Sequence, residues 1–167
     1  MIVEDGTGKT NANAYCTAAF AADYHAARGN AAWDAVEDAD AAIVRATDYL
    51  TQVYGERWQG IRKTGTQALD WPRYDVVIDG YAVDSTVIPD AVKNACAELA
   101  LRAAAGDLLP DVEAEVLSES VGPISVTYAP GARQSAEFRA VDRILAKYLR
   151  SGGNNIPMVR EIGRAHV

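Results

Sequence analysis

The stretch DADAAIVRATDYLTQVY, residues 38–54, carries the strongest secondary-structure signal in the chain. Apolar side chains recur there at helical spacing, among them Ile43, Ala46 and Leu50, and Gly55 follows as a stop. Carboxylates at and just before the start of this stretch suit the positive end of a helix dipole. The pattern predicts a long amphipathic helix with one buried face.

Three more helices are expected on either side of this one. They start at Thr17, at Pro89 and at residue 134 or 135, and end near residues 28, 105 and 149. A short turn or helical piece is expected around Trp33. Alanine supplies 31 of the 167 residues, and it is the best helix former. The composition therefore predicts a mainly α fold built on four helices.

The segments between and after these helices have a different character. Residues 56–88 hold no sustained period and read as a long irregular arm with short extended pieces at 76–78 and 81–83. Residues 115–121 and 124–128 flank Gly122-Pro123 and predict a β-hairpin. We expect a helical domain over residues 1–150 and an extended C-terminal tail over 151–167.

The net charge of −7 is unevenly distributed. Residues 1–132 carry 9 basic and 20 acidic side chains, a net of −11, while residues 133–167 carry 7 and 3, a net of +4. Such asymmetry is typical of an interaction protein. The acidic excess argues against wrapping nucleic acid around the whole surface. We expect no membrane span, because no apolar run approaches about 20 residues, and no signal peptide.

Residues that could carry chemistry do not assemble into a recognisable active site. Gly6-Thr7-Gly8-Lys9-Thr10 resembles the end of a phosphate-binding loop, but Val3 stands where that loop needs glycine, so a surface loop is expected. Cys16 and Cys96 are expected to be small buried hydrophobes. We therefore expect no enzyme activity, no cofactor and no metal site.

Two sets of residues are candidates for contacts with partners. Trp71 and Arg73 form either a core tryptophan with a surface arginine or an anchor between subunits, where these residue types are enriched. A basic ridge is spaced along the fourth helix and just beyond it: Arg139, Arg143, Lys147 and Arg150. This ridge is either a solvated face or a surface for DNA or an acidic partner. Its three or four cations alone are too few for tight DNA binding.

Several short blocks of sequence, taken in their order along the chain, resemble the head–tail adaptor proteins of tailed bacteriophages, which are also called connector or head completion proteins. Members of this group often carry the label DnaT-like ssDNA-binding. The matching blocks run from the N-terminal loop to the hairpin over about residues 3–149: Val3-Glu4-Asp5-Gly6-Thr7-Gly8, Ala12-Asn13-Ala14-Tyr15, Tyr24 through Gly29 with Trp33, Ala46-Thr47-Asp48-Tyr49-Leu50, Arg57-Trp58-Gln59-Gly60, Gln67 through Arg73, Ile88-Pro89, and Val121-Gly122-Pro123-Ile124 ahead of Tyr128.

The resemblance implies a structural virion protein with a connector-type fold. It implies a homo-oligomeric ring of about twelve copies, a dodecamer, that docks on the portal protein, extends the DNA channel and offers an attachment surface to the tail or a stopper neck protein. Genomic double-stranded DNA would pass without sequence-specific binding. The protein would be assembled in the host cytoplasm and located in the virion neck, with roles in head completion and DNA ejection. The tail would supply portal-binding residues: Ile156, Met158, Val159, Arg160, Ile162 and Arg164.

The alternative is a single-stranded-DNA-binding replication protein of the primosomal DnaT-like kind. Such proteins stack bases on aromatic side chains beside a basic groove. We expect Trp33, Trp58 and Trp71 to lie in the acidic body, away from the basic ridge, which favours the adaptor over this alternative.

Overall fold

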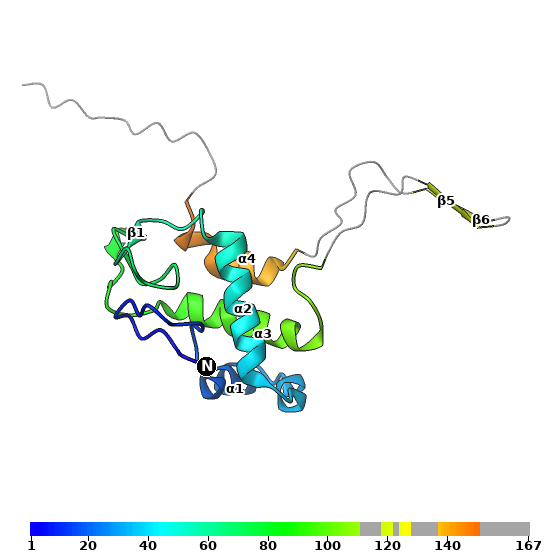
Figure 1. The fold of residues 1–167 in the computed structure, drawn as a ribbon, viewed down its shortest axis with the longest axis horizontal. Coiled ribbons are helices and arrows are strands. Elements are labelled where there is room, and N and C mark those ends of the chain that lie inside the picture. The colour runs from blue at the N-terminus through cyan, green and yellow to red at the C-terminus, as the bar shows by residue number, and fades with distance from the viewer. Residues whose placement is uncertain (111–117, 122–123, 128–136, 151–167) are drawn as a thin grey trace, which may run out of the picture.

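The computed structural model describes residues 1–110, 118–121, 124–127 and 137–150. Its centre is a pair of crossing helices, α2 (Ala39–Tyr54) and α3 (Asp90–Ala105), which pack against each other (Figure 1). The Asp38 carboxylate caps α2 by accepting a hydrogen bond from the Ala41 amide at 2.9 Å. Both helices lie within one residue of their predicted bounds.

Alanine has a packing role where these two helices meet. Ala42 and Ala46 of α2 and Ala95 and Ala100 of α3 are completely buried. Because the distance between packed helices depends on the side chains at the contact, small residues let them approach closely. Ile43, Leu50 and Leu99 fill the remaining space with larger side chains.

The N-terminal helical layer covers one end of this pair. Helix α1 (Ala18–Ala26) begins as predicted, with the Thr17 hydroxyl accepting a hydrogen bond from the Phe20 amide at 3.1 Å. The piece expected around Trp33 is the 3-10 helix η1 (Ala31–Ala35). His25 of α1 is buried, stacks on Trp33 at 5.0 Å and contacts the Ala97 carbonyl oxygen at 3.0 Å.

The fourth helix is shorter than the sequence predicts. Helix α4 spans Arg139–Leu145 and continues as the 3-10 helix η2 (Ala146–Tyr148), so a start at residue 134 or 135 is wrong. Phe138 precedes the helix in a non-helical conformation and packs edge-on against Tyr49 of α2 at 5.3 Å. This contact sets the start of the helix. Val141 and Leu145 are fully buried, so this short helix packs one apolar face against the core.

The arm, residues 56–88, contains two small antiparallel pairs. Strand β1 (Ile61–Arg62) pairs with β2 (Arg73–Tyr74), and β3 (Val77–Ile78) pairs with β4 (Tyr81–Ala82). Asp79 and Gly80 join β3 to β4 with φ of 53° and 87°, as a two-residue hairpin turn requires. The predicted short extended pieces are confirmed.

The predicted hairpin near the C-terminal half is also confirmed. Strands β5 (Ser118–Val121) and β6 (Ile124–Thr127) pair antiparallel, with Ser118 opposite Thr127. The tail, residues 151–167, lies outside the described residues, and with it the six residues expected to bind a portal. The fold is mainly α, as predicted. Within the described ranges, no helix is both long and apolar enough to cross a membrane.

Candidate nucleic-acid interface

The basic ridge, Arg139, Arg143, Lys147 and Arg150, lies at the protein surface. All four side chains are exposed. The Arg139 guanidinium lies 3.8 Å from the Glu137 carboxylate. The Lys147 ammonium lies 2.5 Å from the Asp79 carboxylate. The ridge therefore presents cations to solvent from three places. Arg139 and Arg143 lie on α4, Lys147 lies on η2, and Arg150 follows η2 by two residues.

The arm is joined to this ridge by main-chain hydrogen bonds. Trp58 and Leu149 form an antiparallel bridge. The Gln59 amide donates to the Tyr148 carbonyl at 2.9 Å, and the Arg150 amide donates to the Arg57 carbonyl at 2.7 Å. This pairing places Arg57, an exposed arginine of the arm, next to Arg150 of the ridge.

The tryptophans of the arm lie directly beneath the ridge, which corrects the expectation that they are remote from it. Trp71 packs edge-on against Tyr148 of η2 at 5.9 Å and against Trp58 at 5.7 Å. Tyr54, at the end of α2, extends this cluster and donates a hydrogen bond to Asp142 of α4 at 2.7 Å. Both tryptophans are completely buried. Their rings therefore stabilise the contact between the arm and the C-terminal segment from inside, and they do not face solvent.

Arg73 is neither a surface arginine nor an exposed anchor for another subunit, the two environments that the sequence suggested. Only 5 % of its surface is exposed, and its guanidinium donates to the carbonyl oxygens of Gln59, Gly60 and Asp70 at 2.7, 2.9 and 3.1 Å. Burial lowers its pKa; the Asp70 carboxyl raises it, and nearby Arg150 and Arg62 lower it further. Trp71 and Arg73 thus belong to this chain's own core, and the arginine adds positive potential below the surface.

The exposed aromatic side chains beside the ridge are tyrosines that the sequence analysis missed. Tyr81 on β4 is 79 % exposed and Tyr74 on β2 is 43 % exposed. Tyr74 lies opposite the exposed Ile61, and Val77 adds a further exposed apolar side chain. The Asp79-Gly80 turn was the available signal, because it fixes a hairpin with Tyr81 directly after the turn.

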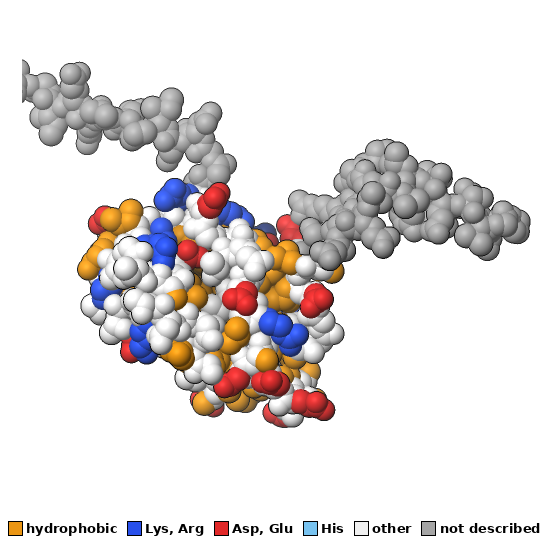
Figure 2. Space-filling model, viewed as in Figure 1, with side chains coloured by type: hydrophobic (Ala, Val, Ile, Leu, Met, Phe, Trp, Pro, Cys, Tyr) orange, Lys and Arg blue, Asp and Glu red, His pale blue; other side chains and the backbone are white. Residues whose placement is uncertain are grey.

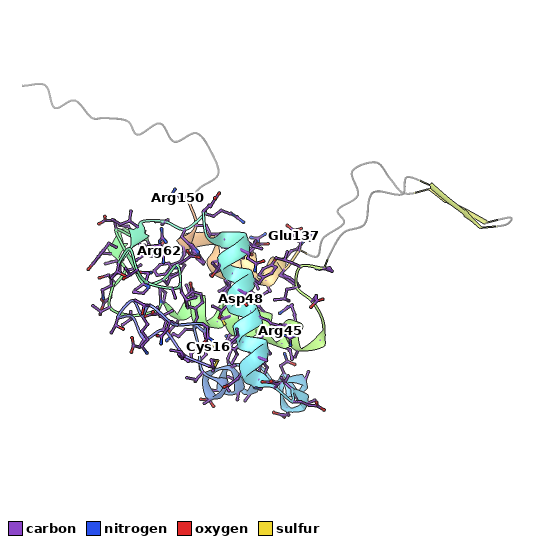
Figure 3. All side chains as sticks on the ribbon, in the orientation of Figure 1. Cys16, Arg45, Asp48, Arg62, Glu137 and Arg150 are labelled. Atoms are coloured by element: carbon purple, nitrogen blue, oxygen red, sulfur yellow. The ribbon has the colours of Figure 1, made fainter. Side chains whose placement is uncertain are left out.

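We call this region the arm–ridge surface and define it by Arg57, Arg62, Tyr74, Tyr81 and the ridge. Figure 3 shows Arg62 and Arg150 on the same side of the molecule. Figure 2 shows blue side chains along the top and left of the molecule with red ones between them, and mostly red ones with one blue group over its lower right. Away from the arm and ridge the exposed carboxylates include Glu37, Asp38, Asp48 and Asp107, which lie around the exposed Arg45. The arm also carries exposed carboxylates, among them Asp75, Asp79 and Asp84, so this surface is a row of cations with acidic side chains beside it.

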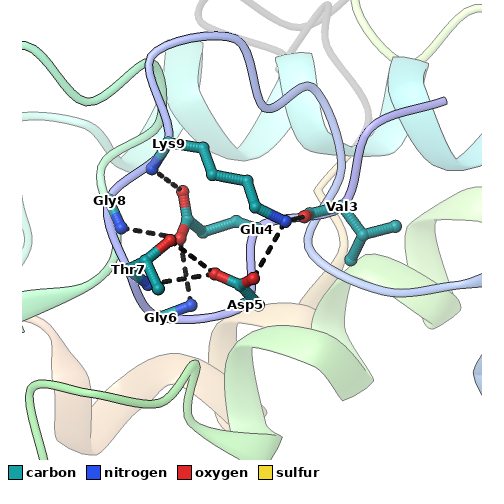
Figure 4. A network of polar contacts seen from close by, with 7 residues as sticks. All are labelled: Val3, Glu4, Asp5, Gly6, Thr7, Gly8 and Lys9. Carbon is teal, nitrogen blue, oxygen red and sulfur yellow. Dashed lines mark hydrogen bonds and ion pairs between the residues drawn. The ribbon is translucent and has the colours of Figure 1, made fainter.

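The N-terminal glycine-rich loop holds its own carboxylate where a phosphate-binding loop would hold a phosphate (Figure 4). Glu4 is buried and accepts hydrogen bonds from the amides of Gly6, Gly8 and Lys9 at 3.0, 2.9 and 2.8 Å. Gly6 has a φ of 98°, and a Cβ there would lie 1.9 Å from the Thr86 carbonyl oxygen. The loop therefore packs on the end of the arm at Thr86 and binds its own Glu4 carboxylate, whereas the sequence predicted only a surface loop.

The two cysteines are the remaining candidate residues, and both lie inside the protein. Cys16 and Cys96 are free and buried, as predicted, and the Cys96 sulfur lies 3.4 Å from the Thr47 hydroxyl. In the described part of the chain, no three His, Cys, Asp or Glu side chains are grouped so that they could hold a metal ion.

The sequence over residues 1–161 matches the family described as "Putative DnaT-like ssDNA binding protein", and the chain belongs to this family. The resemblance is thereby confirmed for the DnaT-like group. No curated protein and no solved structure matches the chain.

The family corrects the leading interpretation of the sequence. Its description is that of the alternative, a DnaT-like single-strand-binding protein, and it overturns the role of a ring adaptor on a portal. It also conflicts with the expected partners, namely a portal, a neck protein and passing double-stranded DNA. The adaptor interpretation rested on the resemblance, and the expected distance of the three tryptophans from the ridge was the argument against the alternative. For Trp58 and Trp71 this distance is corrected, because they contact Leu149 and Tyr148, which lie between the cations of the ridge. The virion location and the absence of enzyme activity stay predictions.

Proposed function

We propose that this chain is a binding protein for single-stranded nucleic acid, without a catalytic step, and that the strand lies on the arm–ridge surface. The observation that carries this proposal is the pairing of residues 57–59 with residues 148–150, which places the cations of two distant segments side by side. The ion pair between Asp79 and Lys147 brings the hairpin that carries Tyr81 to the same ridge. The family to which the chain belongs supports the same class of ligand.

The joined surface has enough cations to track a phosphate backbone. Six exposed basic side chains contribute: Arg57, Arg62, Arg139, Arg143, Lys147 and Arg150. The ridge alone supplies four of these, whereas proteins with useful affinity typically make about 6–10 phosphate contacts. Since phosphate contacts do not distinguish bases, this part of the surface gives affinity without sequence preference.

The exposed tyrosines favour a single strand over a duplex. A base stacks on an aromatic ring only when its face is accessible, and in a duplex both faces are covered by neighbouring base pairs. Tyr81, at 79 % exposure, is the ring most open to such a base, and Tyr74 is the second. Stacking tolerates every base, so the proposed binding is sequence-independent.

Substitution of Tyr81 tests this proposal. We expect Tyr81→Ala to weaken binding of a labelled oligothymidylate by roughly tenfold, since stacking on one aromatic ring is worth about 1–3 kcal/mol per base. Tyr81→Phe is the matched control, because it keeps the ring and removes only the hydroxyl. The measurement is fluorescence anisotropy at fixed salt. Equal affinities for wild type and Tyr81→Ala would remove Tyr81 from the site.

A further inference from the structure

Asp79 is the carboxylate that contacts the basic ridge from the arm. It lies in the turn between β3 and β4, with its Oδ2 atom 2.5 Å from the Lys147 Nζ atom. The two residues are 68 positions apart in the sequence, and both side chains are about two-thirds exposed, at 64 % and 65 %. The hairpin that carries Tyr81 is thus linked through its turn to a cation of the ridge.

This ion pair occupies a position that a nucleic-acid phosphate would need. A carboxylate and a phosphate oxygen are both anionic acceptors and form the same charge-assisted hydrogen bond with an ammonium. An ion pair between solvent-exposed side chains is weak and is screened by salt, so an incoming phosphate can replace it. The carboxylate is tethered, however, so it competes with every phosphate that approaches Lys147.

We propose that Asp79 is an intramolecular competitor of the strand, which neutralises Lys147 in the free protein and must be displaced when a phosphate binds there. This inference rests on the proposed function, since it concerns regulation of the same surface. It predicts that the wild-type protein binds more weakly, and with a shallower salt dependence, than a variant whose Lys147 is unpaired.

The chain offers a closely matched control for this test. Asp75 is another exposed carboxylate of the arm, and its φ of 58° is close to the 53° of Asp79. Asparagine tolerates this left-handed conformation as aspartate does, so Asp79→Asn and Asp75→Asn each remove one charge without new backbone strain. Of these two carboxylates, Asp79 is the one that pairs with Lys147.

The experiment compares these two variants with wild type by anisotropy of a labelled oligothymidylate over a range of salt concentrations. We expect Asp79→Asn to bind roughly three- to tenfold tighter, with the slope of log K against log salt steeper by about 0.7, as one extra phosphate contact requires. Asp75→Asn should change affinity less and leave the slope unchanged. Adding Lys147→Gln to Asp79→Asn should abolish the gain.

The outcomes separate this inference from the proposed function. If wild type binds and the two asparagine variants behave alike, the competitor role is wrong while the proposed function stands. If wild type is silent and Asp79→Asn binds, the competitor role is supported. Binding by none of the three proteins would contradict both, and circular dichroism of each variant checks that the fold is retained.

Discussion

Trp58→Ala is expected to lower the free energy of unfolding by about 3–5 kcal/mol, the range for truncating a buried large aromatic side chain. Trp58 is completely buried and packs against Trp71 at 5.7 Å and Tyr54 at 6.0 Å. Its main chain also forms the bridge to Leu149. The substitution would therefore leave a cavity at the point where α2, the arm and the C-terminal segment meet. Urea denaturation followed by circular dichroism measures the change.

Tyr81→Ala is the control for this prediction. It removes an aromatic ring from the same arm, but that ring is 79 % exposed, so stability should change by no more than about 0.5 kcal/mol. A loss below about 1 kcal/mol for Trp58→Ala would show that the aromatic cluster does not hold the arm to the ridge.

Reversing the charges of Arg57 and Arg150 together should produce the largest loss of binding. The two residues are adjacent because the Arg150 amide donates to the Arg57 carbonyl, and both side chains are exposed. Replacing both with glutamate removes two phosphate contacts and adds repulsion. We expect affinity for a labelled oligothymidylate to fall roughly 30-fold or more. The slope of log K against log salt should become shallower by about 1.4, since two contacts are lost.

The control for this double variant reverses Arg28 and Arg45. Both are exposed arginines outside the arm–ridge surface, Arg28 after α1 and Arg45 on α2, and the change in net charge is identical. If binding depends on the arm–ridge surface, the control should lose much less affinity. Equal losses in the two double variants would mean that net charge, and not this surface, governs binding.

The helices were predictable because their signals are local. The apolar spacing of residues 38–54 and the helix starts expected at Thr17 and Asp38 each depend on residues close in the sequence, and the structure confirms both starts to within one residue. The start of α4 was not predictable in this way, since it depends on Phe138 packing against Tyr49, about ninety positions earlier. Tertiary contacts of this kind override local propensity.

The candidate site was predictable only in its basic half. The spacing of Arg139, Arg143 and Lys147 indicates one exposed helix face, and the structure confirms their exposure. The arm's position against η2 depends on pairing between residues 57–59 and 148–150, which no local pattern encodes. For the same reason the burial of Arg73 was unexpected, because its partners are carbonyl groups of a loop that the sequence leaves irregular.

The glycine-rich loop lacks both the sequence and the free amides of a phosphate-binding loop. The sequence excludes a phosphate-binding loop because Val3 replaces a required glycine. The structure adds the physical reason, since the Glu4 carboxylate already accepts the three amide hydrogen bonds that a phosphate would need. The amides of this loop are therefore not free for a phosphate, and the proposed phosphate contacts lie on the arm–ridge surface instead.

The central claim is that the arm–ridge surface binds a single strand, and a paired titration tests it most directly. The wild-type protein is titrated into a labelled oligonucleotide at low salt, once as a single strand and once annealed to its complement. The account predicts that the single strand binds at least about tenfold tighter, because only its bases can stack on Tyr81 and Tyr74. No binding to the strand, or equal binding to strand and duplex, would contradict it.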